Sequence, residues 1–587
     1  LFEVHDLANT TLAHARFSHL DEATVRQMLT ELYKLCETEL AASYASSDRE
    51  GLHFDGEGNV TIPADLSGHL HTLWDGGWSL LGLPEHMGGV GAPPSVTWAA
   101  LESTLGSNPA LAFYCFGNII ARTIDLLGTE EQKTRIVGPM IEHNWGGSMV
   151  LTEPDAGSDV GAGRTKARHV EGDVWEIEGV KRFISQGDFD CVDNIVHLVL
   201  ARPEGAGPGT KGLSMFIVPK FWVNEDGSLG ERNGAFCTNV EKKMGLKASA
   251  TCEMTFGERI PCRGLLVGND HQGIRQMFHV IEHARMAIGV KTTSTLSTAY
   301  LNALAYAKER VQGPDLLKAT DKTSPRVRIV EHPDVRRMLL LQKAWTEGMR
   351  GLYMYSSSIQ DRVEIAGGHG AEEAKTLDRY NDLILPIVKG FCSEKGYEIL
   401  STSLQCFGGS GYCQDYPIEQ YIRDQKIDTL YEGTTHIQAL DFFFRKVARD
   451  GGATLRTLLG EIREATSSGS DALASEREAL GRGLGEVERI FMGMMGKVGE
   501  SLYHVGLQGN RVLFALGKLV VGWRLVVHAE IAHARSQDAT GTDAAFYRGK
   551  VASARFYCAE ILPELGADRR IIEAGTLDSM DVPEEAF

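Results

Sequence analysis

The residue whose type and position most suggest chemistry is Glu432, in the segment DTLYEGTTHIQALDFFFRK of residues 428–446. It follows the apolar residues Leu430 and Tyr431 and precedes a predicted helix, because Thr435 and Gln438 have the spacing of a capping box. A carboxylate in such a loop can project into a pocket, where loss of water raises its pKa toward the range of a general base. A lone glutamate before a helix is more often exposed or capping, so the surrounding sequence must decide.

The helix predicted after Glu432 would anchor this loop. Gly451-Gly452 marks its end. Its apolar face, from residues at helical spacing, is predicted to comprise Ile437, Leu440, Phe444 and Val447.

Two glycine-rich segments bear on cofactor binding. MVLTEPDAGSDVG, residues 149–161, is a loop of small residues that can bring backbone N–H groups and hydroxyls against a flat ring, although alone it is only a turn. GAGPGTKG, residues 205–212, precedes the strand-like LSMFIVP, so it is interpreted as a hairpin turn rather than a phosphate-binding loop.

Composition excludes several classes. The chain has 587 residues and a net charge of −19, which opposes a nucleic-acid partner. Its ten cysteines form no C-x-x-C pair, so neither a zinc site nor a disulfide framework is indicated and no metal is expected. A reducing compartment is favoured, and a cytoplasmic location is expected. The opening residues lack the pattern of a signal peptide. The apolar run at 512–527 contains Lys518 and Arg524, and is interpreted as a buried helix rather than a transmembrane segment.

The motifs together resemble the acyl-CoA dehydrogenase family, in its long, C-terminally extended bacterial type. LQCFGGSGYCQDYPIEQYIRDQKIDTLYEGT, residues 404–434, is similar to the family's FAD-binding and catalytic region, and residues 149–161 are similar to its flavin loop. The resemblance covers about residues 20–450. It implies that Glu432 of the YEGT motif removes the α-proton of an acyl thioester while a hydride passes to N5 of FAD.

The resemblance also implies a set of FAD contacts. Near the flavin ring it points to Met149, Leu151, Thr152, Ser158, Phe183 and Ser185, with Phe183 standing where many members have Trp. At the pyrophosphate and adenosine end it points to Arg310 and Gln312. The turn that touches the ADP portion of a neighbouring subunit's FAD would comprise Gln405, Cys406, Gly408 and Gly409. Thr434 and His436 follow the base as further contacts, and His436 stands where the family often has Gln.

For the substrate, the resemblance implies contacts from Ser158, Glu282, Arg285 and Gly433. Ser158 would serve the flavin or the pantetheine arm, Glu282 the nucleotide end of CoA, and Arg285 the wall of the active site. Because Glu282 and Arg285 are three residues apart on a predicted helix, a structural ion pair between them is an open alternative.

The fold is predicted to be mainly α with a central β domain. We expect an N-terminal helical domain at 1–147, a mostly antiparallel β domain at 148–268, a helical bundle with the base at 269–449, and an additional helical extension at 450–587. The strand candidates are VWEIEGVKRFIS, NIVHLVLARP, LSMFIVPKF and TCEMTF. A helix is expected over 21–47, no long element over 74–94, a helical pattern over 96–127 and a polar loop at 313–325.

The sequence therefore predicts an FAD-dependent dehydrogenase of a fatty acyl-CoA, forming the trans-2-enoyl-CoA in fatty-acid β-oxidation. The alternatives are an acyl-CoA oxidase, which uses oxygen, and a non-catalytic relative of the fold that binds nucleic acid. An electron-transfer flavoprotein is expected as electron acceptor. A homodimer is expected if the C-terminal helices cover the surface through which shorter relatives form tetramers; the alternative is a separately folded appendage. The sequence does not indicate which acyl chain length the substrate has.

Overall fold

The computed structural model describes residues 1–587, which divide into two compact units. One comprises residues 23–284, and the other comprises residues 1–22 and 285–587. The division falls within the long helix α9 (Gly273–Glu309). The four-domain partition expected from the sequence stays a prediction.

The first part of the 23–284 unit is helical. The helix expected over 21–47 is divided into α1 (Glu22–Thr38) and α2 (Ser43–Glu50) by a 3₁₀ turn. The remaining helices are α3 (Ala64–Asp75), α4 (Pro94–Ser107), α5 (Pro109–Phe113), α6 (Gly117–Leu127), α7 (Glu130–Gln132) and α8 (Gly138–Glu142). Residues 74–94 hold only short 3₁₀ turns after the end of α3, as predicted.

The pattern expected over 96–127 is interrupted where Asn108 caps α5. Its Oδ1 atom accepts hydrogen bonds from the backbone N–H groups of Ala110 and Leu111. Pro109 follows at the first helical position, where a missing N–H costs nothing. The local cap chemistry therefore breaks one predicted helical pattern into separate helices.

An eight-stranded sheet follows in the order β10-β11-β5-β12-β7-β6-β3, with β4 paired to β5 and β6. Its strands are β3 (Gly146–Val150), β4 (Lys166–Glu171), β5 (Val174–Ser185), β6 (Ile195–Pro203), β7 (Ser214–Pro219), β10 (Ala235–Val240), β11 (Thr251–Phe256) and β12 (Arg263–Leu266). A separate hairpin pairs β8 (Phe221–Val223) with β9 (Leu229–Arg232), and another pairs β1 (His53–Phe54) with β2 (Val60–Thr61). Only β3–β6 and β4–β6 are parallel, so the predicted antiparallel character is confirmed.

The sequence located two strands to the residue, since β5 and β11 coincide with VWEIEGVKRFIS and TCEMTF. GAGPGTKG lies between β6 and β7, which pair antiparallel, so its interpretation as a hairpin turn is confirmed.

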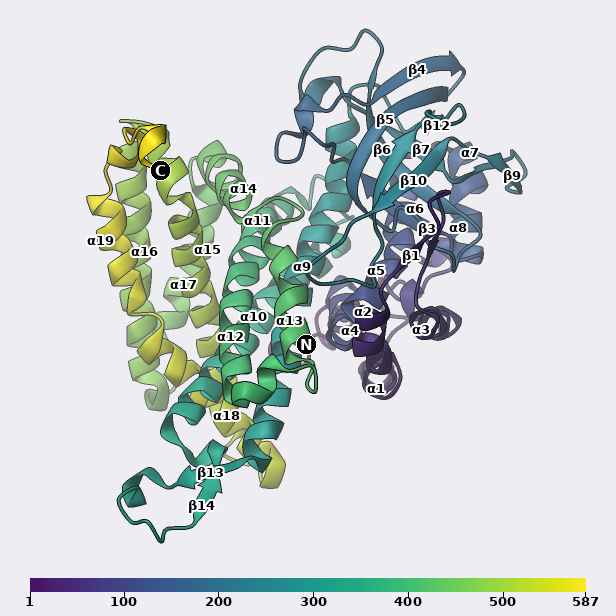
Figure 1. Cartoon of the computed structure of the whole chain (residues 1–587). Coiled ribbons are helices and arrows are strands. Elements are labelled where there is room, and N and C mark those ends of the chain that lie inside the picture. Colours follow the sequence, from purple (N-terminus) through teal and green to yellow (C-terminus); the bar gives the residue numbers. More distant parts are fainter. The chain divides into compact units, whose positions relative to one another are not determined.

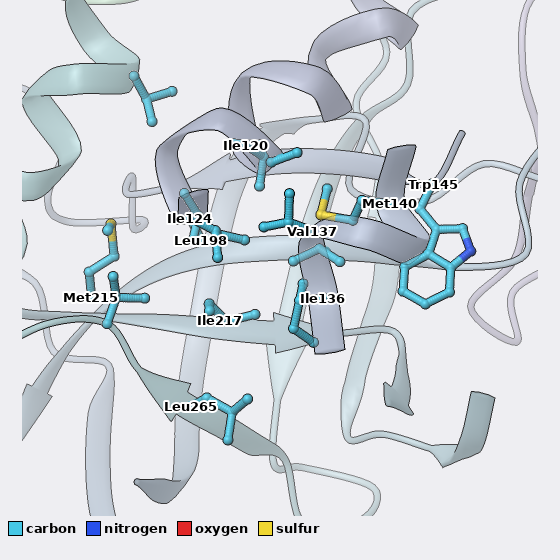
Figure 2. Packing of buried hydrophobic residues seen from close by; sticks show 14 of the residues in the cluster. Ile120, Ile124, Ile136, Val137, Met140, Trp145, Leu198, Met215, Ile217 and Leu265 are labelled. Atoms are coloured by element: carbon cyan, nitrogen blue, oxygen red, sulfur yellow. The ribbon is translucent and has the colours of Figure 1, made fainter. Parts of the chain in front are cut away.

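The core of this unit lies between one face of the sheet and the helices α6 to α8. Figure 2 shows Ile120, Ile124, Ile136 and Val137 on the helices meeting Leu198 on β6 and other strand residues. Helix α6 lies close against β3 at two glycines, because a Cβ added to Gly147 would lie 2.9 Å from Cα of Gly117. This contact fixes β3, and the predicted flavin loop begins at its end.

The second unit is helical. Its helices after α9 are α10 (Pro333–Ile365), α11 (Lys375–Pro386), α12 (Cys392–Phe407), α13 (Ile418–Lys426), α14 (Thr435–Leu440), α15 (Ala453–Ser467), α16 (Ala474–Val498), α17 (Tyr503–Arg535), α18 (Gly541–Glu560) and α19 (Glu564–Ala574). The polar loop expected at 313–325 is the tip of a small hairpin, β13 (Val311–Pro314) with β14 (Arg326–Arg328), which projects from the helices (Figure 1).

The C-terminal helices pack directly on the preceding ones within this unit. A Cβ added to Gly348 of α10 would lie 2.4 Å from Val521 of α17, and the rings of Trp345 and Tyr557 are 5.0 Å apart. The alternative of a separately folded appendage is therefore wrong. Figure 1 shows α16, α17 and α19 running side by side.

Two helical stretches, Pro109–Leu127 and Tyr503–Arg535, are long and apolar enough to cross a membrane by length and composition. In the second stretch, 83% of the apolar window is buried among other helices. The interpretation of residues 512–527 as a buried helix is confirmed.

The helix after Glu432 differs from its prediction in two ways. Thr434, not Thr435, caps α14, its Oγ1 accepting from the N–H of Ile437. The chain then continues as a π-helix from Asp441 to Val447, which adds one residue to the turn and rotates the face. Phe442 and Phe443 are consequently buried, whereas Phe444, expected on the buried face, is 38% exposed. The predicted stop at Gly451-Gly452 is confirmed by positive φ angles at both residues.

Candidate active site

The loop carrying Glu432 has an uncommon backbone conformation. Glu432 has a φ of +54° and Gly433 a φ of +88°. The left-handed region is costly for a residue with a side chain, so the surrounding contacts must hold it. Gln438 Nε2 donates to the carbonyl of Glu432 at 2.9 Å, and Lys389 Nζ donates to the carbonyl of Gly433. The loop is thus held at two consecutive carbonyls.

Burial governs the acidity of Glu432. Loss of water raises the pKa of the Glu432 carboxyl to about 7, while Lys389 and Arg285 oppose the rise with their positive charges. A carboxylate with a pKa in this range can accept a proton near neutral pH and is strong enough as a base to be useful there. The expectation that desolvation raises this pKa is confirmed.

A buried ion pair holds the segment that leads into the loop. Lys291 Nζ lies 2.8 Å from Asp428 Oδ1, and both side chains are completely buried. The hydroxyl of Tyr431 donates to the same Asp428 oxygen at 2.8 Å, and Thr292 Oγ1 donates to the other at 3.0 Å. Asp428 is therefore fully engaged by three donors, which fix the approach to Glu432.

A second buried pair joins Arg285 to Asp441, with 2.9 Å between Nη1 and Oδ2. Arg285 is thus held beside Glu432 by the π-helix that follows α14, and the pair with Glu282 considered from the sequence stays a prediction. Glu282 is half-buried on α9, within residues 23–284. His436 approaches Asn510 of α17, with 3.1 Å between Nδ1 and Oδ1.

In the other unit, the two predicted flavin segments are hydrogen-bonded to each other. The carbonyl of Leu151 accepts from Lys181 Nζ at 2.9 Å, and the carbonyl of Thr152 accepts from the N–H of Arg182 at 2.9 Å. Lys181 also makes a buried ion pair with Glu153, 2.9 Å between Nζ and Oε1. Residues 151–153 are therefore joined to Lys181 and Arg182, which directly precede Phe183 on β5.

Phe183 fits a surface for a flat ring. Its side chain is 58% exposed, its φ is +60°, and Arg182 lies over its ring at 5.0 Å. An exposed aromatic side chain on a strained backbone indicates a ligand surface rather than a core position. Ser185, on the same strand, and Ser158, in the loop, are also exposed. This donor-rich, ring-presenting surface is compatible with a flavin.

The segments predicted for the ADP half of FAD lie side by side in the helical unit. The rings of Tyr306, four residues before Arg310, and Phe407, two residues after Gln405, stack 4.6 Å apart. Arg310 and Gln312 are exposed, and so are Gln405, Gly408 and Gly409. Cys406 differs, because its thiol is buried and accepts from Gln342 Nε2 at 3.5 Å. Only the backbone of Cys406 is available to a ligand.

Comparison with known proteins identifies the family. Four family models match: the acyl-CoA dehydrogenase N-terminal domain at 22–144, its middle domain at 148–258, its C-terminal domain at 271–442, and a model described as acetyl-CoA dehydrogenase C-terminal like at 458–583. The chain is 50% identical over 600 residues to a Mycobacterium tuberculosis protein named broad-specificity linear acyl-CoA dehydrogenase FadE5, covering 100% of this chain and 98% of that protein. This chain belongs to the acyl-CoA dehydrogenase family.

Other members of the acyl-CoA dehydrogenase family are similar over most of their length. A butyryl-CoA dehydrogenase of Syntrophomonas wolfei is 33% identical, covering 94% of this chain and 92% of that protein. Among solved structures, a Bacillus anthracis acyl-CoA dehydrogenase complexed with FAD gives a TM-score of 0.76 at 20% identity, covering 96% of this chain and 90% of that one. Caenorhabditis elegans ACDH-11 in complex with C11-CoA gives 0.75 at 18% identity, covering 98% and 96%. The expected family, fold, enzyme class and FAD dependence are confirmed.

Several residues around Glu432 of this acyl-CoA dehydrogenase were not found by sequence reasoning. They are the buried charged residues Lys291, Lys389, Asp428 and Asp441. A sequence signal existed for the two lysines, since each stands alone in an apolar helical run, MAIGVKTT and LILPIVKGF. Lysine is almost never fully buried without a partner, so such positions deserve a search for one.

Proposed function

We propose that Glu432 removes the α-proton of an acyl-CoA thioester bound beside FAD. The observation that carries the proposal is a half-buried glutamate, its carboxyl raised to a pKa of about 7 by loss of water, on a loop that two hydrogen bonds hold in the left-handed conformation. FAD, when bound, supplies the acceptor for the hydride that leaves the β-carbon. Glu432 supplies the base, and its rigid loop supports the orientation that proton abstraction needs.

The remaining predicted contacts are assigned by the chemistry of their surroundings. Met149, Leu151, Thr152, Phe183 and Ser185 would hold the flavin ring, and the Glu153–Lys181 pair would keep their two segments in register. Thr434 and His436 lie beside the base as further FAD contacts. Ser158, Glu282, Arg285 and Gly433 would contact the substrate. The side chain of Arg285 is already paired with Asp441, which supports a role in shaping the wall rather than in binding an anion.

We propose a homodimer in which the ADP half of each FAD is held by the second copy. Because the Arg310 and Gln405 segments are neighbours through Tyr306 and Phe407, both should serve the same FAD molecule. The guanidinium of Arg310 suits a pyrophosphate, since it can donate two parallel hydrogen bonds.

The physiological reaction is proposed to use linear acyl-CoA substrates, which the name of the M. tuberculosis relative describes for that protein. The electron acceptor is proposed to be an electron-transfer flavoprotein, and the location cytoplasmic. Hydrogen peroxide formed at the rate of acyl-CoA consumption would move the enzyme to the oxidase class.

The base assignment is tested by anaerobic bleaching of the bound flavin with linear acyl-CoA thioesters. Glu432→Gln should bind FAD and acyl-CoA but reduce the flavin about 10²- to 10⁴-fold more slowly, the usual contribution of a general base. Glu347→Gln is a matched control, because Glu347 is also buried but pairs with Lys343 and Lys550. Near-normal reduction by Glu432→Gln would refute the assignment.

A further inference from the structure

Lys389 occupies an uncommon helical turn. It lies in the π-helix Ile387–Phe391, between the ends of α11 and α12. Pro386 immediately precedes this turn inside the helical run, and because proline has no N–H, the regular hydrogen-bond ladder cannot continue through it. The wider turn leaves Lys389 fully buried, among neighbours that are themselves buried. A proline in the sequence thus directly precedes the turn that places an ammonium in the interior.

The ammonium of Lys389 contacts the loop of the base directly. Its Nζ donates to the carbonyl of Gly433, the residue after Glu432. The charged groups that act on Lys389 are the acids Asp428, Glu432 and Glu394 and the cation Arg285. Lys291 and Asp441 complete this cluster through their ion pairs.

The pairing of these charges leaves Lys389 as the counter-charge of the base. Lys291 is paired with Asp428 at 2.8 Å, and Arg285 is paired with Asp441 at 2.9 Å. Glu394 accepts a hydrogen bond from Thr435 at 2.6 Å. A buried carboxylate requires compensation, and a buried ammonium does too. Lys389 and Arg285 are the two cations that act on Glu432, and of these only Lys389 makes no ion pair with another acid.

Close packing brings the lysine turn to the loop. A Cβ added to Gly390 would lie 2.9 Å from Cβ of Gln438, so the absence of a side chain at Gly390 lets α14 approach. Gln438 in turn donates to the carbonyl of Glu432. One face of the lysine turn therefore supports both hydrogen bonds that hold the left-handed loop.

We infer that Lys389 is a positioning residue for proton abstraction: its ammonium holds the loop that carries Glu432 and supplies the buried positive charge that keeps this carboxylate ionised. The inference rests on the proposed function of Glu432 as the base. Burial lowers the pKa of Lys389 to about 8, against opposing contributions from Asp428 and Glu432. The lysine is accordingly charged at neutral pH, where Glu432 ionises.

The test compares substitutions that separate charge from hydrogen bonding. Lys389→Met removes both, Lys389→Gln keeps a donor for the Gly433 carbonyl but removes the charge, and Lys389→Arg keeps the charge. The rate of anaerobic flavin reduction at low acyl-CoA concentration is measured between pH 5 and 10 for each holoenzyme. Lys518→Met is the matched control, because Lys518 is a buried lysine paired with Asp568 and Glu564, away from the loop.

We expect the acidic limb of the profile to move to higher pH by about 1 unit or more in Lys389→Met and Lys389→Gln, because loss of a neighbouring cation disfavours the carboxylate. Lys389→Met should also lose about tenfold or more of the limiting rate at high pH, whereas Lys389→Gln should lose less. Lys389→Arg and Lys518→Met should keep the limb of the parent enzyme. If Lys389→Met does not fold, the comparison of Lys389→Gln with Lys389→Arg still decides.

The inference is overturned if the limb stays in place in the neutral variants, or if Lys518→Met moves it equally. Glu432→Gln distinguishes this failure from failure of the proposed function. If Glu432→Gln is inactive but the acidic limb of the pH profile is unchanged in Lys389→Gln, only the role of Lys389 is refuted. An active Glu432→Gln refutes the base itself.

Discussion

Glu432 has a strained backbone conformation and a carboxyl group that is difficult to ionise. Both features are consistent with its proposed function as a base. Its backbone has a φ of +54°, and loss of water raises the pKa of its carboxyl to about 7, from an ordinary value of 4.5. Groups that are strained and have strongly shifted pKa values concentrate where a protein does chemistry. At the scale of single residues, the backbone strain and the raised pKa of Glu432 therefore support the proposed site as much as the YEGT motif does.

The first prediction at this scale concerns pH. If Glu432 must be ionised to act, the rate of flavin reduction at low substrate concentration should fall about tenfold for each pH unit below about 7, since this parameter reports the free enzyme. The measurement is stopped-flow bleaching of the bound flavin under anaerobic conditions. A rate that stays constant down to pH 5 would contradict a base with this pKa.

The second prediction concerns stability. Because folding raises the pKa of Glu432, the folded state prefers the protonated carboxyl, so this group lowers stability increasingly as pH rises from about 4.5 to about 7. Glu432→Gln resembles the protonated form and should stabilise the holoenzyme at pH 8 by up to about 3 kcal/mol, from 1.36 kcal/mol per pKa unit. At pH 5 the gain should be much smaller. Thermal unfolding at both pH values checks it, and equal shifts would argue against a buried, ionised Glu432.

At the scale of elements, π-helical turns are the main departure from regular structure near the base. One follows Pro386 and contains Lys389, and the other spans Asp441–Val447 and contains the partner of Arg285. Single π-turns within helices occur often at functional sites, because they re-aim side chains without breaking the helix. Here both turns direct charged side chains into the interior around one loop.

The element-scale prediction is Gly390→Ala. Alanine is favoured over glycine in a helix by up to about 1 kcal/mol. Against this, the new Cβ would lie 2.9 Å from Cβ of Gln438 and 3.2 Å from Leu513, and overpacking costs about 1–3 kcal/mol. We expect a lower melting temperature and a several-fold slower flavin reduction, because Gln438 would be displaced from the carbonyl of Glu432.

Gly460→Ala provides the matched control for this substitution. Gly460 lies within α15, and a Cβ at this position would meet nothing within 4 Å. In Gly460→Ala, the higher helix propensity of alanine should therefore raise or maintain stability, and the rate of flavin reduction should not change. If Gly390→Ala behaves like Gly460→Ala, close packing at the lysine turn does not matter for the loop.

The elements also show which features can be predicted from sequence. Strands β5 and β11 were located to the residue, because β-branched and aromatic runs end at clear turn residues. The predicted buried face of the helix after Glu432 was wrong at Phe444, because a pattern with 3.6 residues per turn does not predict a π-turn. The cap was displaced by one residue, from Thr435 to Thr434, since both have a hydroxyl and only the backbone angles distinguish them.

Long-range pairing was the part of the site that local patterns did not contain. Lys291 and Asp428 are 137 positions apart, and Lys389 meets the carbonyl of Gly433 from 44 positions away. The motif predicts Glu432 as the base, whereas the charges around Glu432 are set by helix packing. The sequence predicts that loss of water raises the pKa of Glu432. It does not predict that Lys389 and Arg285 oppose this rise.

At the scale of the whole molecule, the C-terminal helices belong to the same packed unit as the base. Helix α17 contacts the lysine turn, since a Cβ added to Gly517 would lie 2.5 Å from the ring of Phe391. His436, four residues after the base, approaches Asn510 on the same helix. The extension therefore supports the helical bundle from which the active-site loop projects, in addition to any role in assembly.

The last prediction is that the intact holoenzyme is a homodimer. A chain truncated after Gly452 should not remain a soluble dimer. Residues of α10 such as Trp345, Met349 and Leu352 are almost completely buried, and α17 and α18 pack against this helix. Removing residues 453–587 would uncover this apolar surface, which must then aggregate or find another copy.

Light scattering with the refractive index checks both parts of this prediction. The control is a chain ending after Gly575, because the residues beyond it are mostly exposed; it should keep the oligomeric state and the flavin content of the intact protein. The longer truncation should form aggregates or a larger assembly, and should lose flavin reduction because α17 no longer supports the turn that holds Lys389. A tetramer of the intact chain would contradict the covering role of the extension, and an unchanged soluble dimer after truncation at Gly452 would show that α10 does not need it.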